Sequence, residues 1–262
     1  MYEEAILRIS EACRLNSPAN ENDYTDENGI IYCGICHSPR QLDVTLCGKP
    51  MRVFCACKCV SQAAERLKAE KNAAGAQEKA ESFRRQGFTD IAYLGMTFDK
   101  DENPGHTLSK ASRHYAECFS PTPQQHGIMF MGNVGTGKTF YACCIANAVI
   151  DRGFSVWVTT LQPLVRALTD RVSANETIER IQSVDLLVLD DMGTTAQNDF
   201  TTDKLFEIVD ARYRCGKPLI VTTNIHPGDM ENCSLGMRRI FDRLKERCRS
   251  VVVDGKSRRR GE

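Results

Sequence analysis

One glycine-rich segment, Gly132-Asn-Val-Gly-Thr-Gly-Lys-Thr139, constrains the fold of this chain more than any other feature. The apolar residues 128–131 before it predict a short buried strand, and the Ala-, Cys- and Ile-rich residues 140–150 after it predict a helix. Glycines let the backbone turn inward, so that successive N–H groups converge where the helix N-terminus adds its positive end. This strand, loop and helix therefore predict an anion site made of main-chain amides.

The loop also has the spacing Gly-x4-Gly-Lys-Thr, which is typical of nucleoside triphosphatases. Lys138 is expected to reach the β- and γ-phosphates, and the Thr139 hydroxyl to ligate Mg²⁺. A chance glycine-rich turn is the alternative, and the flanking strand and helix argue against it. We therefore predict ATP and Mg²⁺ as cofactors, with the nucleotide held by Gly132, Asn133, Val134, Gly135, Thr136, Gly137, Lys138 and Thr139.

Beyond residue 127 the sequence alternates between apolar runs and helical patterns. The predicted strands are 128–131, 154–159, 185–190, 219–223 and 250–253. The predicted helices are 138–151, 161–172, 175–182, 200–214 and 236–248. Apolar strands that alternate with helices indicate an α/β fold, in which helices sandwich a parallel sheet. Residues 87–126 are less regular, with loops expected at 99–105 and 121–125.

Two of these strands end in polar side chains. Leu186-Leu-Val-Leu-Asp190-Asp191 places carboxylates at the C-terminal edge of the sheet, where open α/β sheets bind ligands. Asp190 is expected to hold Mg²⁺ through water, and Asp191 to orient or deprotonate the attacking water. Asn224 follows strand 219–223 and would help to hold that water if this strand lies between 128–131 and 185–190. Taken singly, each motif also fits a strand that ends in an ordinary turn.

These motifs together resemble the AAA+ branch of P-loop ATPases. The C-terminal order Arg239-Ile-Phe-Asp-Arg243-Leu, then Cys248, then Gly255-Lys-Ser-Arg258 resembles the bacterial replicative-helicase loaders of the DnaC/DnaI type. It is also similar to the related IstB-like ATPases that assist transposases. The resemblance covers about residues 90–260 and lies in the order of the motifs.

The resemblance implies roles for two arginines. Arg243 matches the arginine finger that reaches the nucleotide of a neighbouring subunit, and Arg258 matches an arginine that senses nucleotide in cis. A planar, permanently charged guanidinium suits both tasks. Alternatively, Arg243 is a surface arginine paired with a neighbouring acid, Asp242 or Glu246. Many AAA+ ATPases have Glu where Asp191 stands, which favours a slow, switch-like ATPase.

Six of the thirteen cysteines lie between residues 33 and 59. Cys33-Gly-Ile-Cys36 and Cys55-Ala-Cys57-Lys-Cys59 have the spacing of a four-cysteine structural zinc site. Cys33 and Cys36 would supply two ligands, and any two of Cys55, Cys57 and Cys59 the others. His37 and Cys47 are weaker candidates. An iron–sulfur cluster or a group of unliganded thiols remains open.

We expect three parts in this chain. Residues 1–60 would form an N-terminal helix (2–15) and a zinc-binding module, 61–95 a helical linker containing a long exposed helix (61–86), and 96–262 the AAA+ ATPase domain. The resemblance implies that the N-terminal module grips a helicase. Considered without it, the residues predict only a small metal-folded module, which could equally contact DNA.

The leading functional hypothesis is a loader that uses ATP to deliver a hexameric replicative helicase onto single-stranded DNA. Its subunits would associate through Arg243 in trans, and its contacts with DNA would be mostly to phosphates. The first alternative is a transposition-accessory ATPase that binds DNA and a transposase. A small-molecule P-loop kinase and a non-catalytic adaptor stabilised by ATP are further hypotheses; the order of Asp190, Asn224 and Arg243 fits the kinase poorly.

Charge and hydropathy restrict the compartment and the partners. The 34 basic and 34 acidic residues balance, so there is no global field that attracts nucleic acid, although residues 236–260 are strongly basic. No apolar run reaches eighteen residues and the N-terminus lacks a signal-like pattern, so we expect no membrane association and a cytoplasmic protein. In that reducing compartment the cysteines are thiols or metal ligands.

Overall fold

The fold was described from a computed structural model, which defines residues 2–16, 21–46, 48–193 and 198–255. The chain divides into two compact units, Met1–Gly75 and Ala76–Glu262. Across the described ranges, none of the helices combines the length and the apolar character that crossing a membrane requires.

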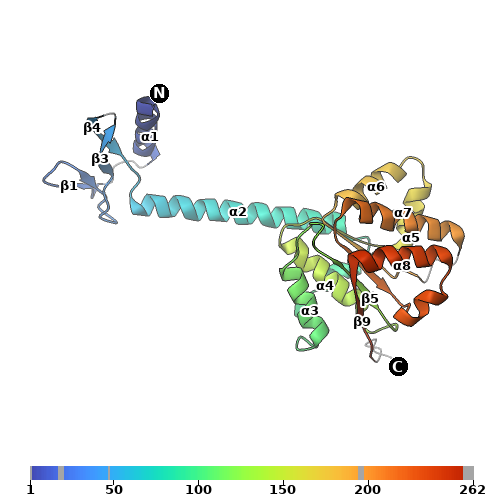
Figure 1. The fold of residues 1–262 in the computed structure, drawn as a ribbon. Helices are drawn as coiled ribbons and strands as arrows, with labels where there is room; N and C mark the ends of the chain where they lie inside the picture. Colours follow the sequence, from blue (N-terminus) through green and yellow to red (C-terminus); the bar gives the residue numbers. More distant parts are fainter. Residues whose placement is uncertain (1, 17–20, 47, 194–197, 256–262) are drawn as a thin grey trace. The chain divides into compact units, whose positions relative to one another are not determined.

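The N-terminal unit is built from a helix and two small hairpins (Figure 1). Its elements are α1 (Tyr2–Asn16), β1 (Tyr24–Thr25), β2 (Ile31–Tyr32), β3 (Gln41–Leu46), β4 (Lys49–Phe54) and the start of α2 (Lys58–Gly87). Helix α1 lies along β4, where the Phe54 amide donates to the Ser10 hydroxyl at 2.8 Å. The buried apolar residues described in this unit are Cys33, Val53 and Cys57. Such a small core needs a further cross-link to be stable.

The helices expected at 2–15 and 61–86 are confirmed as α1 and α2. Helix α2 is 30 residues long and exposed along most of its length, and it contributes residues to both units. Its buried positions are Ala80 and Gly87. At Gly87 a Cβ atom would lie 2.5 Å from the Val156 carbonyl oxygen. The end of the helix therefore packs closely against strand β6 (Val156–Thr160).

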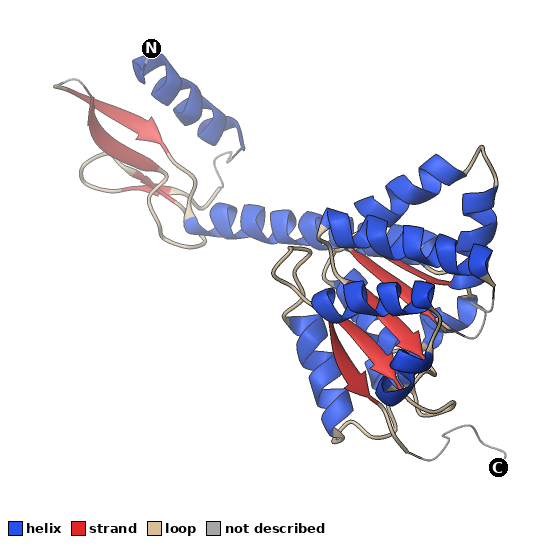
Figure 2. Ribbon diagram, turned by 45° about the vertical axis from the view of Figure 1, so that its right-hand side comes forward, coloured by secondary structure: helices blue, strands red, loops and turns tan. Residues whose placement is uncertain are grey.

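The second unit is an α/β fold around a five-stranded parallel sheet, as the sequence predicts. The strand order is β6-β7-β8-β5-β9, and Figure 2 shows the strands enclosed by helices. The strands are β5 (Gly127–Met131), β6 (Val156–Thr160), β7 (Leu186–Asp190), β8 (Leu219–Thr223) and β9 (Cys248–Val252). The helices are η1 (Ile91–Gly95), η2 (Phe98–Lys100), α3 (Thr107–Glu117), α4 (Lys138–Asp151), α5 (Leu161–Thr169), α6 (Ala174–Ser183), α7 (Asp199–Cys215), η3 (Pro227–Asn232) and α8 (Leu235–Arg247).

The sheet has a hydrophobic core on each face, because successive side chains of a strand point to opposite sides. In β5, Met129 and Met131 join a core formed with α5, α6, α7 and α8. Ile128 and Phe130 join the opposite core, formed with α4 and α3. Central parallel strands buried on both faces explain the continuous apolar runs in the sequence.

Within the less regular stretch 87–126 the sequence analysis did not predict α3, which occupies Thr107–Glu117. Residues 101–105 and 121–125 lack helix and strand, which agrees with the loops expected there. Helix α3 packs on α4 through Leu108, Ser112 and Ala116, which are spaced four residues apart. Leu108 is the one large apolar residue among its buried positions, and the others are serines and an alanine. The helical period was therefore hard to recognise in the sequence.

The register of the sheet decides what can meet at its C-terminal edge. β8 lies between β7 and β5, with Thr223 paired to Met131 and Val221 to Leu189. The prediction for Asn224 required that strand 219–223 lie between strands 128–131 and 185–190, and the observed strand order meets this requirement. The ends of β5, β7 and β8 bring the glycine loop, the two aspartates and the residues after Thr223 to one edge.

Candidate nucleotide site and cysteine cluster

The glycine loop runs from the end of β5 into the first turn of α4. Gly132, Gly135 and Gly137 have φ values of 128°, 81° and 98°, in the left-handed region that glycine adopts without strain. At Gly132 a Cβ atom would also lie 2.5 Å from the Val253 carbonyl oxygen. The loop therefore requires these glycines and opens at the N-terminus of a fourteen-residue helix.

Two side chains close the loop on itself. Lys138 is buried, and its Nζ donates to the carbonyl oxygens of Gly132 at 2.8 Å and Asn133 at 2.6 Å. The Thr136 hydroxyl donates to the same Asn133 carbonyl at 2.9 Å. The Asn133 side-chain oxygen lies 3.0 Å from Nε2 of His226, a residue that sequence reasoning did not single out. The ammonium group is thus held over the loop that would receive a phosphate.

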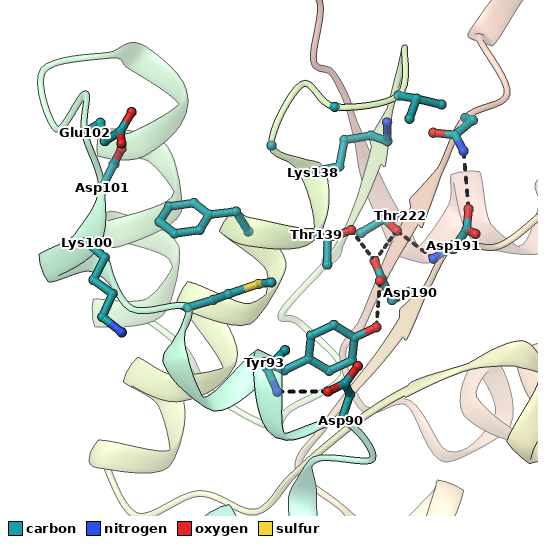
Figure 3. A pocket seen from close by; sticks show the side chains of 17 residues that line it. Asp90, Tyr93, Lys100, Asp101, Glu102, Lys138, Thr139, Asp190, Asp191 and Thr222 are labelled. Atoms are coloured by element: carbon teal, nitrogen blue, oxygen red, sulfur yellow. Dashed lines mark hydrogen bonds between the residues drawn. The ribbon is translucent and has the colours of Figure 1, made fainter. Parts of the chain in front are cut away.

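The Asp190 carboxylate sits at the end of β7 and receives three hydroxyl groups (Figure 3). Thr139 and Thr222 donate to its Oδ1 at 2.8 and 2.6 Å, and Tyr93 donates to its Oδ2 at 3.0 Å. The side chain is 5% exposed. The predicted Mg²⁺ residues Thr139 and Asp190 therefore meet, and a hydroxyl beside a carboxylate is the hard oxygen donor set that Mg²⁺ prefers.

Asp191 and Asn224 lie next to this carboxylate. The Asp191 amide donates to the Thr222 hydroxyl at 2.8 Å, and Asn224 Nδ2 donates to Asp191 Oδ1 at 3.3 Å. Asp191 has a φ of 55°, which a non-glycine residue adopts only where its surroundings impose it. The Thr222 hydroxyl thus contacts both aspartates. Threonine is common in strands, so nothing in the sequence marked Thr222 as part of the site.

A cleft of about 790 Å³ opens over these groups. This volume lies within the usual range for small-molecule sites. Loop residues and the strand ends form one side. The other side comes from a segment that sequence reasoning did not associate with the site: Asp90, Ala92, Tyr93, Met96, Lys100, Asp101 and Glu102. Nothing in its composition distinguishes this segment from a solvated loop; only the packing of η1 and η2 on α4 places it here.

Arg243 lies on α8 and outside this cleft. Its Nη2 donates to Asp210 on α7 at 2.8 Å, so its partner is neither of the two acids considered from the sequence. The guanidinium also lies over the rings of Phe206 and Tyr213, with centroid distances of 4.6 and 5.3 Å. The side chain stays 30% exposed. The other predicted arginine, Arg258, lies outside the described residues.

Four cysteines form one cluster in the N-terminal unit. The Sγ atoms of Cys33, Cys36, Cys57 and Cys59 all lie within 4.8 Å of one another. Cys55 lies outside the cluster and donates to the Pro39 carbonyl at 3.4 Å. Four converging thiols are a soft donor set that fits Zn²⁺. Of the weaker candidates, His37 does not join the cluster and Cys47 lies outside the described residues.

The turns around the cluster are fixed by close backbone packing. The Gly34 amide donates to Asp23 Oδ1 at 3.0 Å, and a Cβ atom at this glycine would lie 2.0 Å from the Asn22 carbonyl oxygen. Asp23 also forms a buried ion pair with Arg40. Hydrogen bonds from Ser38 lower the pKa of the Cys36 thiol to about 5, whereas hydrogen bonds with Cys57 and Cys33 raise the pKa of Cys59 to about 12.

The sheet order, the glycine loop and the paired carboxylates define an ATP-binding domain of the AAA+ P-loop class. Residues 110–262 match the family of IstB-like ATP binding proteins, and the chain belongs to this family.

Its relatives include proteins of replication and of insertion sequences. The chain is 31% identical over 149 residues to the replicative helicase loader DnaC of Escherichia coli K12, covering 55% of this chain and 59% of that protein. It is 28% identical over 119 residues to the insertion sequence IS1162 putative ATP-binding protein of Pseudomonas fluorescens, covering 44% of this chain and 51% of that protein. The chain thus spans little more than half the length of these relatives.

Solved structures show the same fold. The crystal structure of DnaI matches with a TM-score of 0.56 and 21% identity, covering 66% of this chain and 96% of that one. The crystal structure of the DnaC helicase loader matches with a TM-score of 0.54 and 20% identity, covering 63% of this chain and 100% of that one.

Proposed function

We propose that this protein binds Mg²⁺–ATP in the cleft and hydrolyses it slowly, as a switch. The observation that carries the proposal is the meeting of Thr139 and Asp190 beside the glycine loop. Gly132 to Thr139 would wrap the phosphates, and Lys138 would exchange its carbonyl contacts for phosphate oxygens. Bound Mg²⁺ would supply charge neutralisation, with Thr139 and Asp190 holding it.

In this proposal Asp191 orients the attacking water and accepts its proton, and Asn224 holds the Asp191 carboxylate in place. The test compares ATP hydrolysis by wild type, Lys138→Ala and Lys110→Ala. Lys110 is an exposed lysine of α3 and serves as the matched control. We expect hydrolysis to be lost only in Lys138→Ala. Hydrolysis that survives this substitution, or phosphate transferred to a nucleoside instead of water, would contradict the assignment.

We further propose that Arg243 acts in trans on the nucleotide of a neighbouring subunit. Its place outside the cleft of its own chain, its charge and its partial exposure support this role. A finger of this kind accelerates hydrolysis by about 10³- to 10⁵-fold. The test mixes Lys138→Ala chains, which keep the finger, with Arg243→Ala chains, which keep the loop. Recovery of hydrolysis in the mixture supports the role in trans, and an inactive mixture opposes it. Arg258 stays a candidate nucleotide sensor in cis.

The biological role that we propose is delivery of a hexameric replicative helicase onto single-stranded DNA. Relatives named as replicative helicase loaders support it. The relative named as an insertion-sequence ATP-binding protein favours the alternative, an ATPase that binds DNA and a transposase. The discriminating experiment is co-elution with a replicative helicase or with a transposase, with ATP and without nucleotide. Retention of the transposase alone would select the alternative.

The cysteine cluster is proposed to hold one zinc ion through Cys33, Cys36, Cys57 and Cys59. The metal would cross-link the N-terminal unit, whose described residues include few buried apolar side chains. We propose residues 1–60 as the N-terminal helix and zinc-binding module, 61–95 as a helical linker whose end, including Tyr93, lines the cleft, and 96–262 as the ATPase domain. We also propose that the protein is cytoplasmic.

A further inference from the structure

Tyr93 contacts Asp190 from outside the glycine loop and the strand ends, and the proposed ATPase chemistry gives its hydroxyl no role. Its OH donates to Oδ2 at 3.0 Å, whereas both threonine hydroxyls donate to Oδ1. Each carboxylate oxygen accepts about two hydrogen bonds. Thr139 and Thr222 therefore fill Oδ1, and among the described residues Tyr93 is the one side chain whose hydrogen bond to Oδ2 is seen, which leaves that oxygen one acceptor position.

The backbone that carries Tyr93 is tied to the helix that follows the glycine loop. Asn147 on α4 is buried, and its Nδ2 donates to the carbonyl oxygens of Tyr93 at 3.1 Å and Met96 at 3.0 Å. Asp90 caps the start of η1 by accepting from the Ala92 amide at 2.9 Å. Tyr93 is thus fixed relative to the same helix that carries Thr139.

The hydrogen bond from Tyr93 to Asp190 is shielded from water. Tyr93 is 9% exposed and Asp190 is 5% exposed. A neutral phenol that donates to a carboxylate forms a charge-assisted hydrogen bond, which is stronger than one between neutral groups. Such a bond restricts rotation of the carboxylate and directs the remaining acceptor position of Oδ2.

We propose that Tyr93 is a positioning residue that orients Asp190 so that its free Oδ2 position accepts a hydrogen bond from metal-bound water. The inference rests on the proposed Mg²⁺–ATP site. It adds to that site a residue from the segment between α2 and the ATPase sheet. Partners of this kind around metal ligands typically change metal affinity or activity by about 10- to 100-fold.

The experiment measures binding of a fluorescent ATP analogue to the full chain across a series of Mg²⁺ concentrations, and in EDTA. The variants are Tyr93→Phe and, as a matched control, Tyr115→Phe. Tyr115 is a half-buried tyrosine of α3, and its OH donates to the His126 carbonyl at 3.0 Å, away from the cleft. We expect Tyr93→Phe to need about tenfold more Mg²⁺ for half-saturation. Its affinity in EDTA should match wild type, and Tyr115→Phe should match wild type in both conditions.

Two results would overturn the role of Tyr93 while leaving the proposed function intact. One is a Mg²⁺ dependence of Tyr93→Phe that equals wild type. The other is an equal loss of affinity with Mg²⁺ and in EDTA, since that pattern means that the hydroxyl only shapes the pocket. If wild type binds no nucleotide at any Mg²⁺ concentration, the proposed function itself fails, and this inference fails with it.

Discussion

Thr222 provides a quantitative test of how the Asp190 and Asp191 side of the cleft is held, because its single hydroxyl contacts both aspartates. It is 2% exposed, donates to Asp190 at 2.6 Å and accepts from the Asp191 amide at 2.8 Å. Thr222→Val keeps the size and the β-branched shape, so β8 should still pack. The substitution removes a hydrogen bond to a carboxylate, worth about 1.5–3 kcal/mol, and leaves an amide without its acceptor, which costs about 1–3 kcal/mol.

Because Asp191 is exposed, water can partly replace the lost acceptor. We therefore expect the low end of the sum, a loss of about 2.5 kcal/mol in the free energy of unfolding. The control, Thr222→Ser, keeps the hydroxyl and loses one methyl group. We expect it to lower the free energy of unfolding by about 1 kcal/mol.

The assay is urea unfolding followed by fluorescence of Trp157. It is the only tryptophan in the sequence and is 7% exposed in β6, so it reports on the ATPase unit. Equal losses in Thr222→Val and Thr222→Ser would refute the reasoning, since they would show that the hydroxyl contributes nothing to stability.

Three further predictions concern the cysteines and one glycine. Zinc analysis should find one ion in Cys55→Ser and none in Cys57→Ser, because only the second thiol belongs to the cluster; equal zinc contents would contradict the assignment. Burial raises the pKa of Cys248 to about 12 from an ordinary value of 9.0, so its contribution to stability is complete below pH 9 and falls between pH 9 and 12. The unfolding free energy should therefore fall less between pH 8 and 10.5 in Cys248→Ala than in wild type. Gly127→Ala should lose about 3 kcal/mol in urea unfolding, because its Cβ would lie 1.9 Å from a carbonyl oxygen of β8, whereas Gly228→Ala, with nothing within 4 Å, should match wild type.

Much of the ATPase fold was accessible from the sequence, because its signals are local. The apolar runs that became β5, β7 and β8 are buried on both faces. Among the helices between them, α5 and α6 each have a clear apolar face. Their alternation restricts the fold to a parallel sheet covered by helices. Helix α3 was missed because Leu108 is the one large apolar residue among its buried positions. The roles assigned to Lys138 and Asp191 stay predictions.

The sequence by itself determined the glycine loop, the strand ends that carry Asp190 and Asn224, and the presence of a cysteine cluster, since each depends on residues close together in the chain. Only the tertiary structure decided that Tyr93 and Thr222 meet Asp190, that Cys55 stays outside the cluster, and that Arg243 pairs with Asp210. These contacts join residues brought together by strand order and helix packing. A linear pattern does not specify such contacts, because the two partners of each contact lie more than thirty residues apart in the sequence.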